Sequence, residues 1–385
     1  MEYIKLCDIC DFQGGSQPPK DEWSFEPRDG YIRMLQIRDF TQGERVTPEY
    51  IKITKTTKVC KADDILIARY GASLAKILTG LSGAYNVAIM RTIPNTKLLE
   101  KKYLYYYLKS STFQTFLLNI GNRAAQAGFN KKDLEELRIP NISREAQCEI
   151  VSILERVEAI ISTRQQQLQK LDELVKARFV ETFVATDAAS DWPYCTIADV
   201  SNDMRTGPFG SALHHDEFVD SGVFVLGIDN AVENKFSYNR MRYITAEKYQ
   251  ELKRYTVYPG DVIITIMGTV GRSAVIPADM PKAINTKHLA CITPNAKMVN
   301  AQFLSCAFQV HPDIRAQLQK QCKGAIMDGL NLTIIKGLSF HIPPINLQDR
   351  FVGFYERVDK SKVAVQKALD EAQLLFDSLM QEYFQ

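Results

Sequence analysis

The feature that most constrains this chain is an internal repeat, because a series of short motifs occurs twice, in the same order, at an offset of about 200 residues. The strongest pair is DILIARYG at 64–71 and DVIITIMG at 261–268. Each is an apolar, β-branched run between Asp and Gly, which predicts a buried strand that ends in a turn. Because the offset is far longer than a solenoid period, the repeat predicts a duplicated domain, followed each time by a linker.

Further motifs keep the same order in both halves. The pairs are 6–9 with 197–200, 13–16 with 206–211, 31–37 with 223–228, 84–86 with 283–285, 94–95 with 294–295, 103–118 with 303–318, 128–130 with 329–331, and 139–140 with 342–343. They comprise strand-like runs, a glycine-containing loop, an aromatic helical segment and a closing Ile-Pro. An ordered series of this length predicts that the two domains share one fold.

After each Ile-Pro the apolar residues recur every three or four positions, which is typical of a long helix with a coiled-coil seam. The seam residues are Ile150, Leu154, Val157, Ile161, Leu168, Leu171 and Val175 in the first helix, and Val358, Val365, Leu375 and Leu379 in the second. Ser143 is expected to cap the first helix. A helix of about 40 residues is about 60 Å long and needs a partner helix in water. Since a whole domain separates the two helices, we expect them to lie antiparallel.

The expected fold class is therefore α+β. It consists of two homologous domains of mixed α/β structure, separated by two long antiparallel coiled-coil helices, with pseudo-twofold symmetry. The predicted boundaries are 1–142 for the first domain, 143–186 for the central helix, 187–343 for the second domain and 344–385 for the distal helix. A chain of 385 residues agrees with this division, since it exceeds what one hydrophobic core usually serves.

Composition adds expectations about environment and partners. The sequence has neither a long apolar run nor the apolar segment of a signal peptide at its N-terminus, so we expect a cytoplasmic protein. The eight cysteines are scattered and are expected to be reduced thiols. The formal net charge is only +2, with the basic excess in residues 1–140. If the ligand is nucleic acid, partner proteins are expected to supply part of the phosphate contact.

The order domain, helix, domain, helix, with each domain opened by a short Asp-containing strand and closed by Ile-Pro, resembles the specificity subunit of type I restriction-modification systems. The resemblance covers essentially the whole chain. Its most specific element is the repeated motif, DILIARYGASLAK in the first half and DVIITIMGTVGR in the second. The resemblance implies that each domain is a target recognition domain for one half of a split double-stranded DNA target, and that the helices set the spacing between the halves.

The same resemblance implies a division of labour among subunits. This chain would be a non-catalytic targeting subunit without a cofactor. Modification subunits, expected as two copies, would bind S-adenosylmethionine and methylate adenine. Restriction subunits, where present, would use ATP and Mg to translocate and cleave DNA. The sequence itself contains no Walker A motif, no Gly-x-Gly-x-x-Gly turn and no adenine methyltransferase motif.

Two functions from other classes are also compatible with the sequence. The chain could be a coiled-coil scaffolding protein in which two homologous domains bind other proteins. It could also be a stand-alone site-specific nuclease. Binding to a split duplex together with a methyltransferase would favour the targeting subunit, whereas cleavage of DNA by the purified chain with a divalent ion would favour the nuclease.

The strongest candidate DNA contacts lie in loops that follow a strand-ending glycine. Lys76 and Arg272 occupy matching positions there, and glycine permits a close backbone approach to the duplex. Arg69 and Tyr70 in the first loop could contact bases, although Tyr70 is equally typical of a core aromatic. Lys76 and Arg272 could instead each be a solvated surface charge.

The remaining candidates are Ser16, Gln17, Arg38, Arg123, Gln126, Arg205, Ser211, His214, His215 and Lys323. Most of them belong to the glycine-containing loops or to the loops before the Gly-x-Asn motif, and Arg38 is expected on a strand. Each could equally be an ordinary surface residue. The adjacent histidines have too few neighbouring ligands to predict a metal site. The aromatic set Tyr103, Tyr106, Tyr107, Phe113 and Phe116 has helical spacing, which predicts core residues.

Overall fold

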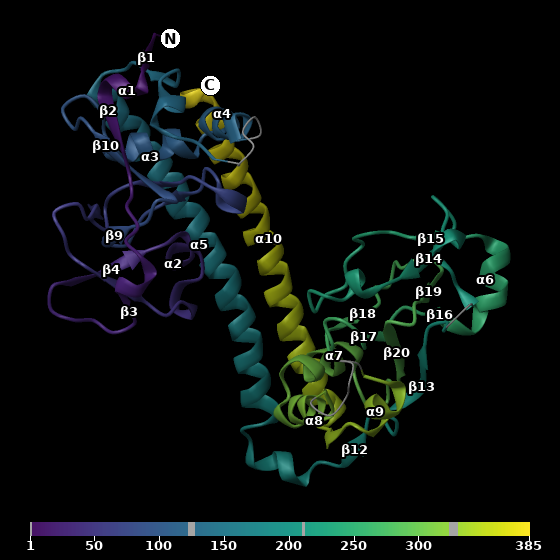
Figure 1. The fold of residues 1–385 in the computed structure, drawn as a ribbon. Coiled ribbons are helices and arrows are strands. Elements are labelled where there is room, and N and C mark those ends of the chain that lie inside the picture. The colour runs from purple at the N-terminus through teal and green to yellow at the C-terminus, as the bar shows by residue number, and fades with distance from the viewer. Residues whose placement is uncertain (1, 122–127, 210–211, 323–329) are drawn as a thin grey trace. The chain divides into compact units, whose positions relative to one another are not determined.

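The computed structural model describes residues 2–121, 128–209, 212–322 and 330–385 (Figure 1). The chain divides into two compact units, Met1–Gln165 with Lys367–Gln385, and Gln166–Gln366. Each unit contains one repeated domain and parts of two 40-residue helices, α5 (Arg144–Phe183) and α10 (Ile345–Phe384). The expected combination of two mixed α/β domains with two long helices is confirmed. The four segment boundaries stay a prediction.

The described part of the first unit contains three sheets. One has the strand order β2 (Cys10–Gly14), β10 (Ile89–Pro94), β7 (Leu66–Ala68), β8 (Ile77–Leu78). Another has the order β3 (Trp23–Ser24), β5 (Glu49–Lys52), β4 (Tyr31–Leu35), β9 (Gly83–Tyr85), β6 (Val59–Cys60). The third pairs β1 (Tyr3–Lys5) with β11 (Arg138–Pro140). Only β4 and β9 pair in parallel among these described strands.

The helices of the first domain are α1 (Leu6–Ile9), α2 (Ile37–Thr41), α3 (Lys101–Lys109) and α4 (Ser111–Gly121), with short 3₁₀ turns η1 (Lys20–Glu22), η2 (Gly43–Arg45), η3 (Gly71–Ser73) and η4 (Lys131–Leu134). As predicted, the aromatic set on α3 and α4 lies in the core. Tyr103 packs 5.1 Å from the ring of Phe384 at the end of α10, and Leu154 of α5 is buried in the same cluster. Both long helices are thus part of the core of this unit.

The second unit repeats the arrangement, except that its described strands form a four-stranded sheet where the first unit has a five-stranded one. One sheet has the order β13 (Ser201–Thr206), β20 (Leu289–Pro294), β17 (Val262–Thr265), β18 (Ser273–Val275), and another has the order β15 (Tyr243–Ile244), β14 (Val223–Leu226), β19 (Ala283–Asn285), β16 (Thr256–Val257). A third pairs β12 (Tyr194–Thr196) with β21 (Ser339–His341). β14 and β19 are parallel, as β4 and β9 are. The repeat in the sequence therefore corresponds to a repeat of strand order and direction.

The helices of the second domain are α6 (Ala246–Leu252), α7 (Ala301–Val310), α8 (Pro312–Cys322) and α9 (Leu332–Gly337), with 3₁₀ turns η5 (Asp187–Asp191), η7 (His215–Glu217), η8 (Ile228–Asn230) and η9 (Lys253–Tyr255). Asn300 caps α7, because its side chain accepts hydrogen bonds from the backbone of Gln302 and Phe303. Phe303 of α7 stacks on Phe179 of α5 with ring centroids 5.5 Å apart. This contact joins the long helix to the domain core.

A buried glutamine near the start of α5 ties this helix to the first domain. The backbone N–H of Glu100 donates to Gln147 Oε1 at 2.8 Å. Gln147 Nε2 donates to the carbonyl oxygens of Leu98 and Ile142 at 3.0 and 3.1 Å. The first bond satisfies the N–H of the residue before α3, a group that a helix N-terminus leaves unpaired, and the other two join α5 to the chain before α3 and before α5.

Gln348 of α10 makes the same three bonds in the second unit. It accepts from the backbone N–H of Asn300 at 2.8 Å and donates to the carbonyl oxygens of Met298 and Pro343 at 3.0 and 2.8 Å. Neither glutamine stands out in the sequence, because a single polar residue leaves no periodic signal. Because their contacts match, Gln147 and Gln348 occupy equivalent positions at the start of α5 and the start of α10.

The two long helices lie antiparallel in the second unit. Phe351 of α10 packs against Phe179 and Phe183 of α5, with ring centroids 5.4 Å apart in both pairs. Further along, Lys362 of α10 forms an ion pair with Asp172 of α5. Residue numbers therefore rise along one helix as they fall along the other, as expected.

At the start of α5, the predicted cap is confirmed, since the N–H of Ala146 donates to Ser143 Oγ at 3.2 Å.

Most predicted seam residues lie inward. Leu154, Val157, Val175 and Val358 are buried, and Ile150, Ile161, Leu168, Leu171, Val365 and Leu379 are partly buried. The expectation for Leu375 is wrong, since its side chain is 50% exposed. Phe376 and Met380 lie on the inward face instead, beside Ala372, and the ring centroid of Phe376 lies 6.3 Å from that of Tyr106. The domain as well as the partner helix thus decides which face of α10 is buried.

Two expectations from composition meet direct observations. None of the described helices is long and apolar enough to span a membrane. The described cysteines, which are Cys7, Cys10, Cys60, Cys148, Cys195, Cys291 and Cys306, are free thiols.

Candidate nucleic-acid interface

In the first unit a closed hairpin loop joins β7 to β8. The backbone N–H of Ala68 donates to the carbonyl of Lys76 at 2.9 Å, and that of Ala75 donates to the carbonyl of Ala68 at 2.9 Å. Gly71 and Ala75 have φ values of 67° and 68°, in the left-handed region that reverses the chain in tight turns. Tyr70 lies in this loop and is 40% exposed, so it is not a core aromatic.

The second unit has an equivalent loop between β17 and β18. The backbone N–H of Thr265 donates to the carbonyl of Arg272 at 2.8 Å, and that of Gly271 donates to the carbonyl of Thr265 at 2.8 Å. Gly268 and Gly271 have φ values of 70° and 81°. Met267, at the position of Tyr70, is also 40% exposed. The backbone geometry therefore places Lys76 and Arg272 at equivalent positions.

Lys76 and Arg272 are both exposed, and neither side chain forms an ion pair with another residue in the described parts of the chain. A flexible cation beside an exposed loop tip can contact a phosphate without first breaking an internal ion pair. Each loop thus combines a large exposed side chain at its tip with an accessible positive charge at its base.

Arg69 is held in a fixed orientation beside Tyr70. Its Nε and Nη1 donate to the carbonyl oxygens of Phe129 and Val87, each at 3.0 Å. Its guanidinium carbon lies 5.0 Å from the centroid of the Tyr70 ring, which is a cation–π contact. Gly128 lies against the same ring, because a Cβ there would be 2.3 Å from it. The loop therefore presents a pre-organised Arg69–Tyr70 pair, in which Nη2 makes no hydrogen bond to any residue that the structure describes.

The glycine-containing loops of the two halves are also equivalent. A Cβ on Gly15 would lie 2.1 Å from the carbonyl oxygen of Asn86, and a Cβ on Gly207 would lie 2.2 Å from that of Asn285. Both positions thus require glycine because another strand end passes too closely for a side chain. After the glycine, the first unit has Ser16 and the exposed Gln17.

At the matching positions the second unit has Pro208 and Phe209, and Phe209 is 58% exposed. His214 and His215 follow in the same loop and are exposed. The backbone N–H of His214 donates to Glu217 Oε2 at 2.6 Å, and the ring of His215 lies 5.8 Å from that of Phe218. The two loops therefore share a backbone turn but present different side chains.

Arg205 lies on β13 and is enclosed by the sheet. Its guanidinium donates to Asp261 at 2.5 Å, to Asp203 at 2.7 Å and to Thr293 Oγ1 at 3.0 Å, and Nε donates to the carbonyl of Thr256 at 2.9 Å. Its side chain is only 12% exposed, and that of Asp261 is 1% exposed. Because its donors already have partners within the sheet, Arg205 is a structural residue of this unit.

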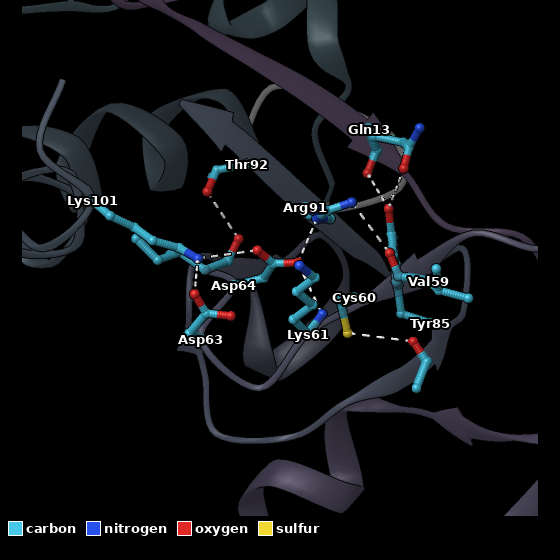
Figure 2. Close-up of polar contacts among 12 residues, drawn as sticks. Gln13, Val59, Cys60, Lys61, Asp63, Asp64, Tyr85, Arg91, Thr92 and Lys101 are labelled. Carbon is cyan, nitrogen blue, oxygen red and sulfur yellow. Dashed lines mark hydrogen bonds and ion pairs between the residues drawn. The ribbon is translucent and has the colours of Figure 1, made fainter. Parts of the chain in front are cut away.

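The equivalent carboxylate in the first unit, Asp64, is also buried and paired (Figure 2). Arg91 Nε lies 2.7 Å from Asp64 Oδ2, Lys101 Nζ lies 3.1 Å from Oδ1, and the N–H of Lys61 donates at 2.9 Å. Burial alone would raise the pKa of Asp64. The hydrogen bonds from Lys61 and Lys101 and the charges of Arg91 and Lys101 outweigh burial, so the pKa lies below its usual value.

The arginine that meets this carboxylate comes from different strands in the two units. Arg91 on β10 is the cross-strand partner of Gln13 on β2, and Cys291 on β20 is the cross-strand partner of Arg205 on β13. The first unit therefore has an arginine, Arg91, at the position of Cys291 in the second unit. The second unit has an arginine, Arg205, at the position of Gln13 in the first unit. The order of motifs in the sequence does not reveal this exchange, because it shows neither strand pairing nor burial.

The other candidates are dispersed. Arg38 is on helix α2, not on a strand as expected, and forms an ion pair with Glu49. Arg123, Gln126, Ser211 and Lys323 lie outside the described residues. No group of three or more His, Cys, Asp or Glu side chains that could hold a metal ion occurs in the described ranges. Within the first unit, Arg69 of the hairpin loop lies beside the glycine-containing loop, since a Cβ on Gly14 would be 3.4 Å from its Nη1.

Two specificity subunits are among the curated proteins that this chain resembles. The chain is 21% identical over 278 residues to the type I restriction enzyme MjaVIII specificity subunit of Methanocaldococcus jannaschii, a match that covers 69% of this chain and 63% of the relative. It is 19% identical over 386 residues to the type I restriction enzyme EcoBI specificity subunit of Escherichia coli, covering 93% of this chain and 79% of the relative. The match to the first thus spans less than two thirds of that protein's length.

Among the solved structures that share the fold, two match across the whole chain and have the following similarities. One, from a study of the structural basis underlying complex assembly and conformational transition of the type I R-M system, gives a TM-score of 0.62 at 16% identity and covers 100% of this chain and 97% of that chain. The other is the S subunit of the type I restriction-modification system from M. genitalium, with a TM-score of 0.56, 15% identity and coverage of 100% and 96%.

The family model for the type I restriction modification DNA specificity domain matches residues 1–173 and again residues 189–372. These two ranges contain the two repeated domains and most of both long helices. The resemblance noted in the sequence is confirmed, and the chain belongs to the family of type I restriction modification DNA specificity domains.

Proposed function

We propose that this chain is the DNA-specificity subunit of a type I restriction-modification complex, with one half of a split target recognised by each domain. The observation that carries the proposal is the pair of equivalent hairpin loops, 69–75 and 266–271. Each exposes a large side chain at the tip and an accessible cation at the base. In the proposed interface the cation contacts phosphate and the tip contacts a base edge in the groove.

The proposed half-sites differ because the loops differ in chemistry. The Arg69–Tyr70 pair can donate hydrogen bonds from Arg69 Nη2 and from the tyrosine hydroxyl, whereas Met267 offers only an apolar contact of the kind that favours a thymine methyl group. Gln17 can bond to a base or a phosphate, whereas Phe209 at the same position can only pack. Equivalent backbones with different tips support an asymmetric, two-part target.

The proposed role is targeting, with catalysis supplied by other subunits of the assembly in the cytoplasm. The chain would recruit adenine methyltransferase subunits, expected as two copies, and restriction subunits where the system has them. S-adenosylmethionine would be bound by the modification subunits, and ATP and Mg by the restriction subunits. The long helices would set the gap between the half-sites, since α5 is 40 residues long and contributes to both units.

Sequencing of methylated adenines tests this function. A host that lacks its own restriction-modification systems would express the chain with its modification subunit. We expect methylation at a two-part motif with a fixed gap, and no methylation when the chain is omitted. A methylation pattern that does not depend on this chain, or a contiguous motif, would contradict the proposal.

A further inference from the structure

In the first unit one carboxylate holds two side chains at the end of β4. Glu49, the first residue of β5, accepts hydrogen bonds on Oε2 from Gln36 Nε2, at 2.5 Å, and from Arg38 Nη2. The side chain of Glu49 is 17% exposed and that of Arg38 is 45% exposed. Arg38 Nε and Nη1 form no hydrogen bond with any residue that the structure describes. The carboxylate thus fixes one side of the guanidinium and leaves its other donors accessible.

The second unit contains an ion pair of opposite polarity. Arg242, the residue before β15, donates from Nη2 to Asp229 Oδ2 of η8 at 2.8 Å. Arg240 Nη1 lies 3.9 Å from Asp229 Oδ1, but its side chain is 74% exposed, so Arg242 is the arginine that the carboxylate holds. A Cβ on Gly227 would lie 2.5 Å from Arg242 Nη1, so the guanidinium packs on the backbone of this glycine. Nε and Nη1 of Arg242 form no hydrogen bond within the described ranges.

Arg38 and Asp229 occupy equivalent positions. Each is the second residue of a helical turn, α2 or η8, that follows β4 or β14. In both units the backbone N–H of the residue before the turn donates to the side chain of the third residue of the turn. These bonds run from Gln36 to Asp39 Oδ2 at 2.9 Å and from Gly227 to Asn230 Oδ1 at 2.8 Å.

Glu49 and Arg242 are equivalent as well. Glu49 is the cross-strand partner of Met34, which lies two residues before the residue that precedes α2. Val225 lies at the same distance from η8, and its N–H donates to the carbonyl of Arg242 at 2.8 Å. The arginine and the carboxylate have therefore exchanged places between the two units, while the ion pair itself is kept.

Both ion pairs lie beside the loops of the proposed interface. In the first unit the carbonyl of Leu35 accepts from the N–H of Asn86 at 3.2 Å, and Asn86 is the residue that Gly15 closely approaches. In the second unit a Cβ on Gly268, in the hairpin loop, would lie 3.6 Å from Ile228 Cδ1 in η8. A duplex that contacts these loops therefore comes close to the ion pairs.

We propose that this ion pair is a second specificity element of each domain, in which the carboxylate holds Arg38 or Arg242 so that its remaining donors bind the edge of a guanine. Arginine bonded to O6 and N7 of guanine is the commonest specific contact in the major groove. The neighbouring carboxylate repels a phosphate, so the pair favours a neutral base edge, whereas Lys76 and Arg272 are the proposed phosphate contacts. The inference rests on the proposed function and adds one guanine contact to each half-site.

Methylation kinetics with the modification subunit, on duplexes in which each base pair of the target is changed in turn, test this inference. The wild-type chain should prefer one G·C pair in each half-site by about fivefold to 150-fold. Arg38→Gln should reduce this preference to about one in one half-site, and Arg242→Gln should do so in the other. E49Q keeps Arg38 but releases it, so this variant should weaken the same preference and make DNA binding more salt-dependent.

The matched control is Lys102→Gln, which removes the cation of an exposed ion pair with Glu155 in the same unit and should keep every preference. R38E/E49R tests for a purely structural role. It keeps an ion pair, but Gln36 fills the space that Gly227 leaves open in the second unit. This variant should have the melting temperature of the wild type without its preference for guanine, and a restored preference would overturn the inference.

Unchanged preferences in both Arg38→Gln and Arg242→Gln would also overturn the inference, while two-part methylation by these variants would leave the proposed function intact. An equal loss on every duplex with a weaker salt dependence would overturn it too, because the arginines would then contact phosphates. If the wild-type chain directed no two-part methylation at all, both the inference and the proposed function would fail.

Discussion

At the scale of residues, side chains at equivalent positions of the two domains have different structural roles. Arg205 was a candidate DNA contact from its place before a glycine-rich loop, yet it neutralises the buried Asp261. Arg91 performs this task for Asp64 in the first unit. A buried carboxylate without a cation would be costly, so each domain keeps one arginine beside it. The exposed loop tips carry no such constraint and are free to differ.

Replacement of Tyr70 by alanine should reduce recognition of one half-site only. The exposed ring and its hydroxyl are lost, and Arg69 loses the surface that orients it. Loss of one base contact typically costs about 1–3 kcal/mol, which corresponds to a methylation rate lower by about fivefold to 150-fold. Methylation kinetics on duplexes with single changes in either half-site would measure the effect.

The control for Tyr70 is Leu98→Ala, which removes an exposed apolar side chain of the same unit outside the loops. Its methylation kinetics should match the wild type. An equal loss at both half-sites in the Tyr70 variant, or no loss at all, would contradict the assignment of Tyr70 to one recognition loop.

Gln348→Ala should destabilise the second unit. The substitution leaves the N–H of Asn300 and the carbonyl groups of Met298 and Pro343 without their partner, in partly buried or buried surroundings. Leaving such groups unsatisfied costs about 3 kcal/mol in total, at the lower end of 1–3 kcal/mol for each group. Urea denaturation would measure the loss. Gln381→Ala, at an exposed position of the same helix, should change the free energy of unfolding little, and an equal effect of both substitutions would refute the role of Gln348.

At the scale of elements, the long helices belong to the domain cores as much as to each other. Phe384 at the end of α10 packs against Tyr103 and Tyr107, and Phe179 of α5 stacks on Phe303. These contacts explain why Leu375 is exposed although heptad spacing places it on the seam. A helix that packs against both a domain and a partner helix buries a wider face than a helix in a simple coiled coil. Heptad spacing alone therefore does not predict which of its residues are buried.

Insertion of one heptad after Gln165 in α5, with a second heptad after Gln366 in α10, should lengthen the gap between the half-sites. Seven helical residues add about 10 Å, which is about three base pairs at 3.4 Å per pair. Both half-sites should stay the same, because no domain residue changes. Sequencing of methylated adenines would show the new gap, and an unchanged gap would refute the role of the helices in spacing.

At the scale of the whole molecule, the chain contains two versions of one domain with a common strand order, parallel pair and glutamine anchor. The two versions differ in the exposed side chains of the hairpin and glycine-containing loops, and in the strand that supplies the arginine beside the buried carboxylate. Duplication followed by change at these positions is a simple route to two different half-sites on one chain.

Exchange of residues 13–132 for the same segment of another family member should therefore change one half-site and preserve the other. The segment contains the loops of the first domain but neither long helix. The methylated motif of the hybrid should combine a new half with the original half at the original gap. A change in both halves would show that the domains do not recognise DNA independently.

The sequence by itself determined the repeat, the two long helices and the turns at Gly71 and Gly268, because each depends on local spacing or local backbone geometry. The equivalence of Lys76 and Arg272 followed from the same motifs. Only the tertiary structure decided which arginine meets the buried carboxylate, which face of α10 turns inward, and that Gln147 and Gln348 anchor the helices. These features depend on contacts between residues far apart in the chain. Strand pairing and close packing determine such contacts, and no local sequence pattern predicts them.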